Sequence, residues 1–187
     1  MKRFAIALSM LALGACAGGE RVPVRIYDFG LAPAAAPAAV SVHVLAVTSP
    51  AWLDVQDMLY RLAYRDPLAL EPYAFSRWAG TPPAMLTLRL RQTFGTLPAR
   101  QARCALQVNL SEFSQVFSRA DASRATLHAS AVVYRLNGDR QRDQLELRLE
   151  RDAPTPDAAG AAAAFSALAD ELTVLLRDWV AGTGYCG

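Results

Sequence analysis

The alternation of apolar and polar residues between positions 104 and 152 predicts a meander of three antiparallel strands. A change of parity after Ser111 indicates a β-bulge in the first strand. A loop centred on residues 137–139 pairs Leu136 with Arg140 and keeps both apolar faces aligned, which a two-residue turn would not do. In this register three leucines face apolar partners on the second strand: Leu145 opposite Ala131, Leu147 opposite Ala129, and Leu149 opposite Leu127.

The alanine-rich segment that follows has the period of a helix. Thr155-Pro156-Asp157 predicts its start, and Gly182 and Gly184 predict its end. Its large apolar residues follow the three- and four-residue spacing of one buried stripe: Phe165, Leu168, Leu172, Leu175, Leu176 and Trp179.

The sequence pattern in the first half of the domain predicts further strands. Residues 24–29 alternate as a half-buried strand does, and residues 30–39 form a loop rich in Ala and Pro. Residues 40–47 carry apolar side chains at both parities, which is typical of a central strand covered on both faces. Two aromatic-rich segments, 58–65 and 71–78, are joined by a short link containing Pro67 and predict a β-hairpin.

A second helix begins at Thr81-Pro82-Pro83, since a hydroxyl cap followed by proline is favourable in the first turn. It ends near Gly95. Its buried face contains Leu86, Leu90, Phe94 and Leu97, with Arg89 and Gln92 directed away from that face. The whole pattern predicts a single-domain α/β sandwich whose largely antiparallel, mixed sheet has five to seven strands and two main helices.

The amino terminus has the layout of a lipoprotein signal. A basic start precedes an apolar run over residues 4–13, about half of the ~20 residues that a membrane span needs. The run ends in Leu13-Gly14-Ala15-Cys16, a lipobox pattern in which the Cys thiol receives diacylglycerol before cleavage. We therefore expect a signal peptide over 1–15, a lipidated tether over 16–23 and a domain over 24–187.

Lipidation at Cys16 predicts firm attachment to a membrane, because stable anchoring takes more than one acyl chain and such a cysteine carries two or three. Ala17 follows Cys16 in place of the Asp that signals retention at the inner membrane. This favours the outer membrane, with the domain on the periplasmic face. Two cysteines remain in an oxidising compartment, and an even pair predicts a Cys104–Cys186 disulfide; the alternative is two unpaired thiols.

The charge balance and the missing motifs reduce the number of function classes that the sequence supports. Without the signal peptide, the 19 basic residues fall to 17, equal to the 17 acidic residues, so the balance gives no indication of nucleic-acid binding. The two histidines, His43 and His128, lie in strand patterns rather than at a nucleophile or in a metal-ligand spacing. Asp54 and Asp57 are interpreted as capping or solvated residues. The sequence predicts no catalytic residue, metal or cofactor.

The aromatic hairpin is the remaining functional candidate. Two interpretations stay open for Tyr60, Tyr64, Tyr73, Phe75 and Trp78. They form a partner surface or line an apolar groove, or they fill the core, since strands favour aromatic residues. Because Tyr, Trp and Arg dominate protein interfaces, we select as candidate partner contacts the residues Tyr60, Arg61, Tyr73, Arg77 and Trp78.

Several segments, in this order, resemble the ABC-type transport auxiliary lipoprotein family, which includes the paraquat-inducible protein C lipoproteins: Ile26–Gly30, Pro50–Asp54, Met58–Arg61, and Tyr73–Ala79 ahead of Pro82-Pro83. The resemblance implies a non-catalytic accessory component that works with a mammalian-cell-entry (MCE) protein, a permease and an ATPase. It implies transport of lipids or other hydrophobic molecules, and a homo-oligomer is compatible with it.

Two rival functions stay open at this stage. One is a lipoprotein regulator of cell-wall synthesis that acts as a binding module, which the neighbouring genes would distinguish. The other is an envelope hydrolase, against which the missing triad and metal motifs argue. A lipid-carrying pocket within the domain is a further alternative.

Overall fold

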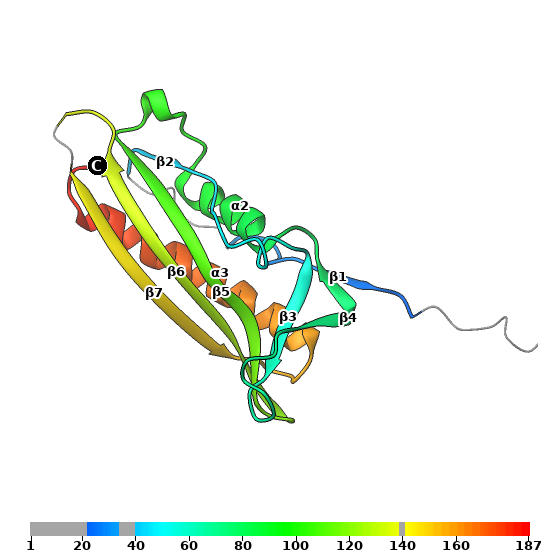
Figure 1. Ribbon diagram of the computed structural model, residues 1–187. Helices are drawn as coiled ribbons and strands as arrows, with labels where there is room; N and C mark the ends of the chain where they lie inside the picture. The colour runs from blue at the N-terminus through cyan, green and yellow to red at the C-terminus, as the bar shows by residue number, and fades with distance from the viewer. Residues whose placement is uncertain (1–21, 34–39, 139–140) are drawn as a thin grey trace, which may run out of the picture.

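The computed structural model describes residues 22–33, 40–138 and 141–187. The predicted signal peptide, Cys16, most of the tether and Arg140 of the predicted Leu136–Arg140 pair lie outside these residues. Within them, seven strands form one mixed sheet, and two long helices lie on the same face of it (Figure 1). The predicted fold class is confirmed.

The predicted meander forms the long part of the sheet and is antiparallel throughout. It consists of β5 (Cys104–Arg119), β6 (Ala122–Arg135) and β7 (Arg142–Asp152). The predicted pairs of Leu145, Leu147 and Leu149 are confirmed, and so is the bulge, which lies between Leu110 and Glu112. The register follows from burial, because a shift of one residue would turn these leucines to solvent.

The predicted hairpin is confirmed as β3 (Asp57–Leu62) and β4 (Glu71–Trp78). Strand β3 continues the sheet by pairing in parallel with residues 115–117 of β5. Strand β1 (Arg25–Tyr27) pairs in parallel with β4, and in the described part of the chain it is the outermost strand on that side. The sheet order is therefore β1-β4-β3-β5-β6-β7.

The expectation for residues 40–47 is wrong. The strand there, β2 (Val42–Val44), has three residues, and in the described sheet it pairs with β5 alone. Strands β2 and β3 pair with the same edge of β5. Strand β2 lies beside residues 104–106 of β5, and β3 lies beside residues 115–117. The strand ends at Val44, and the chain continues as a loop in which Val47 is also buried. Apolar residues therefore occur at both parities although the strand itself is short.

Helix α2 (Pro82–Phe94) begins after Thr81 and ends at Gly95, as predicted. Leu86, Leu90 and Phe94 are buried, but the expectation that Arg89 points away from the core is wrong. Arg89 is 3% exposed; it donates hydrogen bonds to the carbonyls of Phe29 and Gly30, and its Nη1 lies 3.2 Å from Asp170 Oδ1. A second helix covers this side of α2, which the sequence of α2 alone cannot reveal.

That second helix is α3 (Ala158–Gly182), which begins after Asp157 as predicted. The stripe residues Phe165, Leu168, Leu172 and Leu176 are buried against the sheet. Leu175 is the exception at 39% exposed, since adjacent helical residues lie ~100° apart and Leu176 already faces inward. By length and composition α3 could cross a membrane, but its buried stripe makes it a core helix of this domain.

The carboxy terminus is joined to the sheet by the predicted disulfide. Cys104 begins β5 and is bonded to Cys186, and the two Cα atoms are 5.6 Å apart. Both side chains are fully buried. Beside the bond, Ser41 N–H donates to the Cys186 carbonyl at 2.7 Å, so the disulfide also positions the segment that leads into β2.

Replacing both cysteines by serine should lower the free energy of unfolding by about 4–5 kcal/mol, since the bond closes a loop with a sequence separation of 82 residues. Urea unfolding of the oxidised protein, the reduced protein and the C104S/C186S variant measures this. The reduced protein should match the variant. Equal stability of oxidised and reduced protein would contradict the structural role of the bond.

Candidate functional site

The candidate contact residues of the hairpin divide between the two faces of the sheet. Tyr60 and Tyr73 lie together on the helix-covered face, with ring centroids 4.7 Å apart. Arg61 lies at the opposite parity of β3, and its Nη2 is 3.3 Å from Glu112 Oε2. The structure thus brings the two tyrosines together and places Arg61 apart from them.

Arg77 and Trp78 also separate, because neighbouring strand residues point to opposite faces. Arg77 is about one third exposed, and its Nε lies 3.0 Å from Asp57 Oδ1. Trp78 is 2% exposed and packs edge-on against Phe113 and Phe165, with centroids 5.8 Å apart in each case. Trp78 is therefore a core residue, and its assignment as a direct partner contact is corrected.

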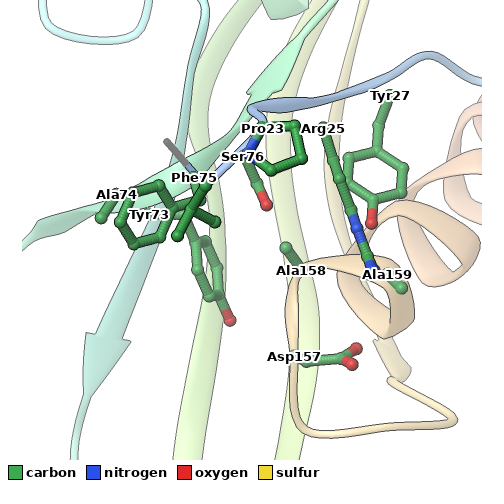
Figure 2. A pocket seen from close by; sticks show the side chains of 11 residues that line it. Pro23, Arg25, Tyr27, Tyr73, Ala74, Phe75, Ser76, Asp157, Ala158 and Ala159 are labelled. Carbon is green, nitrogen blue, oxygen red and sulfur yellow. The ribbon is translucent and has the colours of Figure 1, made fainter. Parts of the chain in front are cut away.

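A groove of about 430 Å³ lies where β1 and β4 meet the first turn of α3. Figure 2 shows Arg25 and Tyr27 extending from β1 toward this turn, and Tyr73 entering from β4. Its lining is largely apolar, with one charge of each sign. The lining consists of Val22, Pro23, Arg25, Tyr27, Tyr73, Ala74, Phe75, Ser76, Asp157, Ala158 and Ala159.

The walls of the groove follow from strand register. Arg25 pairs with Ser76, and Tyr27 pairs with Trp78. Paired residues of parallel strands share a face, and Ser76 and Trp78 are buried, so Arg25 and Tyr27 face the helix. The intervening Ile26 faces outward and is 70% exposed. The alternation predicted for residues 24–29 is present, but its apolar members Val24 and Ile26 lie on the solvent face.

The floor of the groove is the capped start of α3. Asp157 Oδ1 accepts hydrogen bonds from Gly160 N–H at 2.8 Å and from Thr155 Oγ1 at 2.7 Å. A Cβ at Gly160 would lie 2.0 Å from the Thr155 carbonyl oxygen, so the capping turn can approach the helix only at a glycine. The hydrogen bonds from Gly160 and Thr155 lower the pKa of Asp157, and Arg25 adds a smaller effect in the same direction.

Hydrogen bonds connect the groove to the sheet. The Tyr73 hydroxyl donates to Gln115 Oε1 at 2.6 Å, and Gln115 Nε2 donates to Ser123 Oγ at 2.7 Å and to the Asp157 carbonyl at 3.3 Å. Burial, with a smaller contribution from the charge of Asp157, raises the pKa of Tyr73 well above its usual value. Tyr73 therefore remains a neutral donor and holds the groove wall in place.

Among residues 22–33, 40–138 and 141–187, no group of three His, Cys, Asp or Glu side chains is arranged to hold a metal ion. The histidines lie in strands as predicted, and His43 Nδ1 is 2.8 Å from the Leu97 carbonyl. Of the two aspartates, Asp54 is exposed, and Asp57 forms the ion pair with Arg77.

Of the residues that line the groove, the selected partner contacts include Tyr73 alone, and sequence reasoning missed Arg25 and Asp157 among others. Asp157 was identified as a helix cap, but nothing local indicates that the cap faces β1. Phe75 lies in the predicted hairpin and is 53% exposed. Strand β4 has apolar residues on both faces, and this pattern is the signal that could have selected Phe75 as a contact residue.

The fold defines a small α/β domain with a largely apolar surface groove. The sequence model of the family described as ABC-type transport auxiliary lipoprotein component matches residues 30–175, and the chain belongs to this family. It is thus an accessory lipoprotein of ABC-type transport, associated with the cell envelope.

Solved structures show the same fold. A Xanthomonas campestris protein of the DUF330 family is 19% identical, with a TM-score of 0.68 over 87% of this chain and 94% of that one. A second crystal structure, of an uncharacterized protein, is 12% identical, with a TM-score of 0.69 over 85% and 99% of the two chains. No curated protein matches the sequence.

The Asp157 cap should contribute to stability in a pH-dependent manner. Asp157→Ala should lower the free energy of unfolding by about 1 kcal/mol at pH 7 through loss of the cap. Asp157→Asn keeps a cap but removes the charge. Because the pKa of Asp157 is lowered in the folded state, its charge stabilises the fold above the unfolded pKa, and this contribution is lost as the pH falls below about 4.

Urea unfolding at pH 7 and pH 3 measures both effects. The difference between the natural protein and the Asp157→Asn variant should shrink at pH 3. A difference that stays constant, or grows toward low pH, would contradict the assignment.

Proposed function

We propose that this protein is an outer-membrane lipoprotein that serves as a non-catalytic accessory component of an MCE-linked ABC system. The system transports lipids or other hydrophobic molecules. The observation that carries the proposal is the family match over residues 30–175 in a chain that also contains a lipobox ending at Cys16. The groove, with its apolar lining and without a metal-binding cluster in the described residues, supports a binding role.

The proposed anchor is Cys16, acylated and cleaved from residues 1–15. Each buried methylene of an acyl chain contributes about 0.8 kcal/mol, so two or three chains hold a protein at a bilayer far more firmly than one. Ala17 in the next position favours the outer membrane. The domain then projects into the periplasm, where it meets the distal part of the transport assembly.

We assign contact with the MCE protein to the β3–β4 hairpin, through Tyr60, Arg61, Tyr73 and Arg77. The ion pairs Arg61–Glu112 and Arg77–Asp57 hold both guanidinium groups in fixed positions. A partner that binds them has less side-chain entropy to remove than it would with free arginines. Trp78 supports this surface from the core without touching the partner.

Cys16→Ser should move the protein from the membrane fraction to the soluble periplasmic fraction. Mass spectrometry of the natural protein should show a mature amino terminus at an acylated Cys16. The serine variant should lack the acyl mass. An unmodified Cys16, or a serine variant that still fractionates with outer membranes, would refute the proposed anchor.

Arg61→Gln and Arg77→Gln should each reduce co-purification of the MCE protein about 5- to 30-fold, the range for truncation of an interface anchor. Arg148→Gln, at an exposed position of β7 on the other side of the sheet, is the matched control and should have no effect. Thermal melts of all three variants establish that the fold is retained. Recovery equal to that of the control would refute the hairpin assignment.

A further inference from the structure

Four large apolar side chains lie on β1, on β4 and on the residues that lead into β1. They are all at least half exposed: Val22 at 55%, Val24 at 51%, Ile26 at 70% and Phe75 at 53%. We call them the apolar row. Ile26 faces outward beside Arg77, whereas Val22 and Phe75 also form part of the groove lining. A row of this kind on a soluble surface indicates a surface that is covered in the functional state.

Charge distinguishes this side of the sheet from the opposite one. Strand β7, outermost on the other side of the described sheet, has the sequence RDQLELRLERD, and most of its charged residues are exposed. Such charges are the usual protection of an edge strand against unwanted association. Residues 22–26 contain one charge, Arg25, and it lies on the groove side rather than in the apolar row.

The length of the tether decides what can cover the apolar row. Only residues 17–21 separate Cys16 from Val22, so even a fully extended chain spans about 20 Å between them. Strand β5, with 16 residues, is roughly 50 Å long. An acylated Cys16 therefore keeps the β1 end of the domain at the bilayer, because the tether is too short for the domain to present another end. In Figure 1 the chain leaves the domain at β1, away from β7 and the carboxy terminus.

We infer that the apolar row rests on the lipid surface to which Cys16 is anchored, and so sets the orientation of the domain on the membrane. This inference rests on the proposed acylation of Cys16. Apolar side chains on an exposed face, next to a lipid anchor, add buried apolar area at the interface between lipid headgroups and acyl chains. Because Val22 and Phe75 also line the groove, the contact brings one side of the groove to the lipid surface.

The test uses the full-length, acylated protein inserted into preformed vesicles of phosphatidylethanolamine and phosphatidylglycerol. Single cysteines are introduced by Ile26→Cys, Phe75→Cys and, as the control on β7, Arg148→Cys. An environment-sensitive fluorophore reacts only at the introduced thiol, because Cys104 and Cys186 are bonded and Cys16 is acylated. Quenching by lipids that carry a spin label near the headgroup reports contact with the bilayer.

Labels at positions 26 and 75 should be quenched at least threefold more than the label at 148. Ile26→Asp should reduce quenching at position 75 at least twofold, whereas Leu31→Asp, at a 99% exposed apolar residue outside the row, should not. Equal quenching at the three positions, with acylated Cys16 confirmed by mass, would overturn the orientation but leave the proposed function intact.

Two further outcomes would also overturn the inference. A blue-shifted label at position 26 that the lipid quencher does not reach would show that a second copy or a partner protein covers the apolar row. A Cys16 without acyl chains would remove the tether argument, and then the inference and the proposed anchor fail together.

Discussion

The packing of four aromatic rings is the interaction on which the groove depends. Phe113 of β5 stacks on Phe165 of α3 with centroids 3.9 Å apart, and Trp78 and Phe29 pack edge-on or tilted around them. These rings come from four separate segments of the chain. Within the described sheet, the hairpin pairs with β5 only through residues 60–62 of β3, so backbone pairing alone holds it weakly. The aromatic cluster fixes β4 against α3 and thereby sets the width of the groove.

Local signals explain which parts of the fold the sequence predicts. The register of the meander, the start of α3 at Asp157 and the end of α2 at Gly95 all depend on residues close in sequence. The failures share a different cause. Arg89 is buried because α3 covers it, and Val24 and Ile26 are exposed because the other face of β1 is the one that α3 approaches. Such facts depend on contacts between distant segments, which periodicity does not contain.

The same limit applies to the candidate site. Composition identified the hairpin as aromatic, but a strand with aromatic residues at both parities does not reveal its buried side. The register of β3 and β4 also shifts between Asp57 and Leu59. Hence Trp78, which looks like an interface anchor in the sequence, is part of the core, whereas Phe75 is half exposed. The groove was beyond prediction because its floor and walls come from opposite ends of the domain.

Strands β1 and β4 give their two faces different chemistry. The inner face presents Arg25, Tyr27 and Ser76 to the capped start of α3, whereas the outer face presents the exposed Ile26 beside Arg77. The two surfaces meet, because Val22 and Phe75 belong both to the apolar row and to the groove lining. The proposed contact with the membrane and the proposed contact with a partner both involve this two-strand element. The aromatic cluster that contains Trp78 packs β4 against α3 and so holds both surfaces in place on the domain.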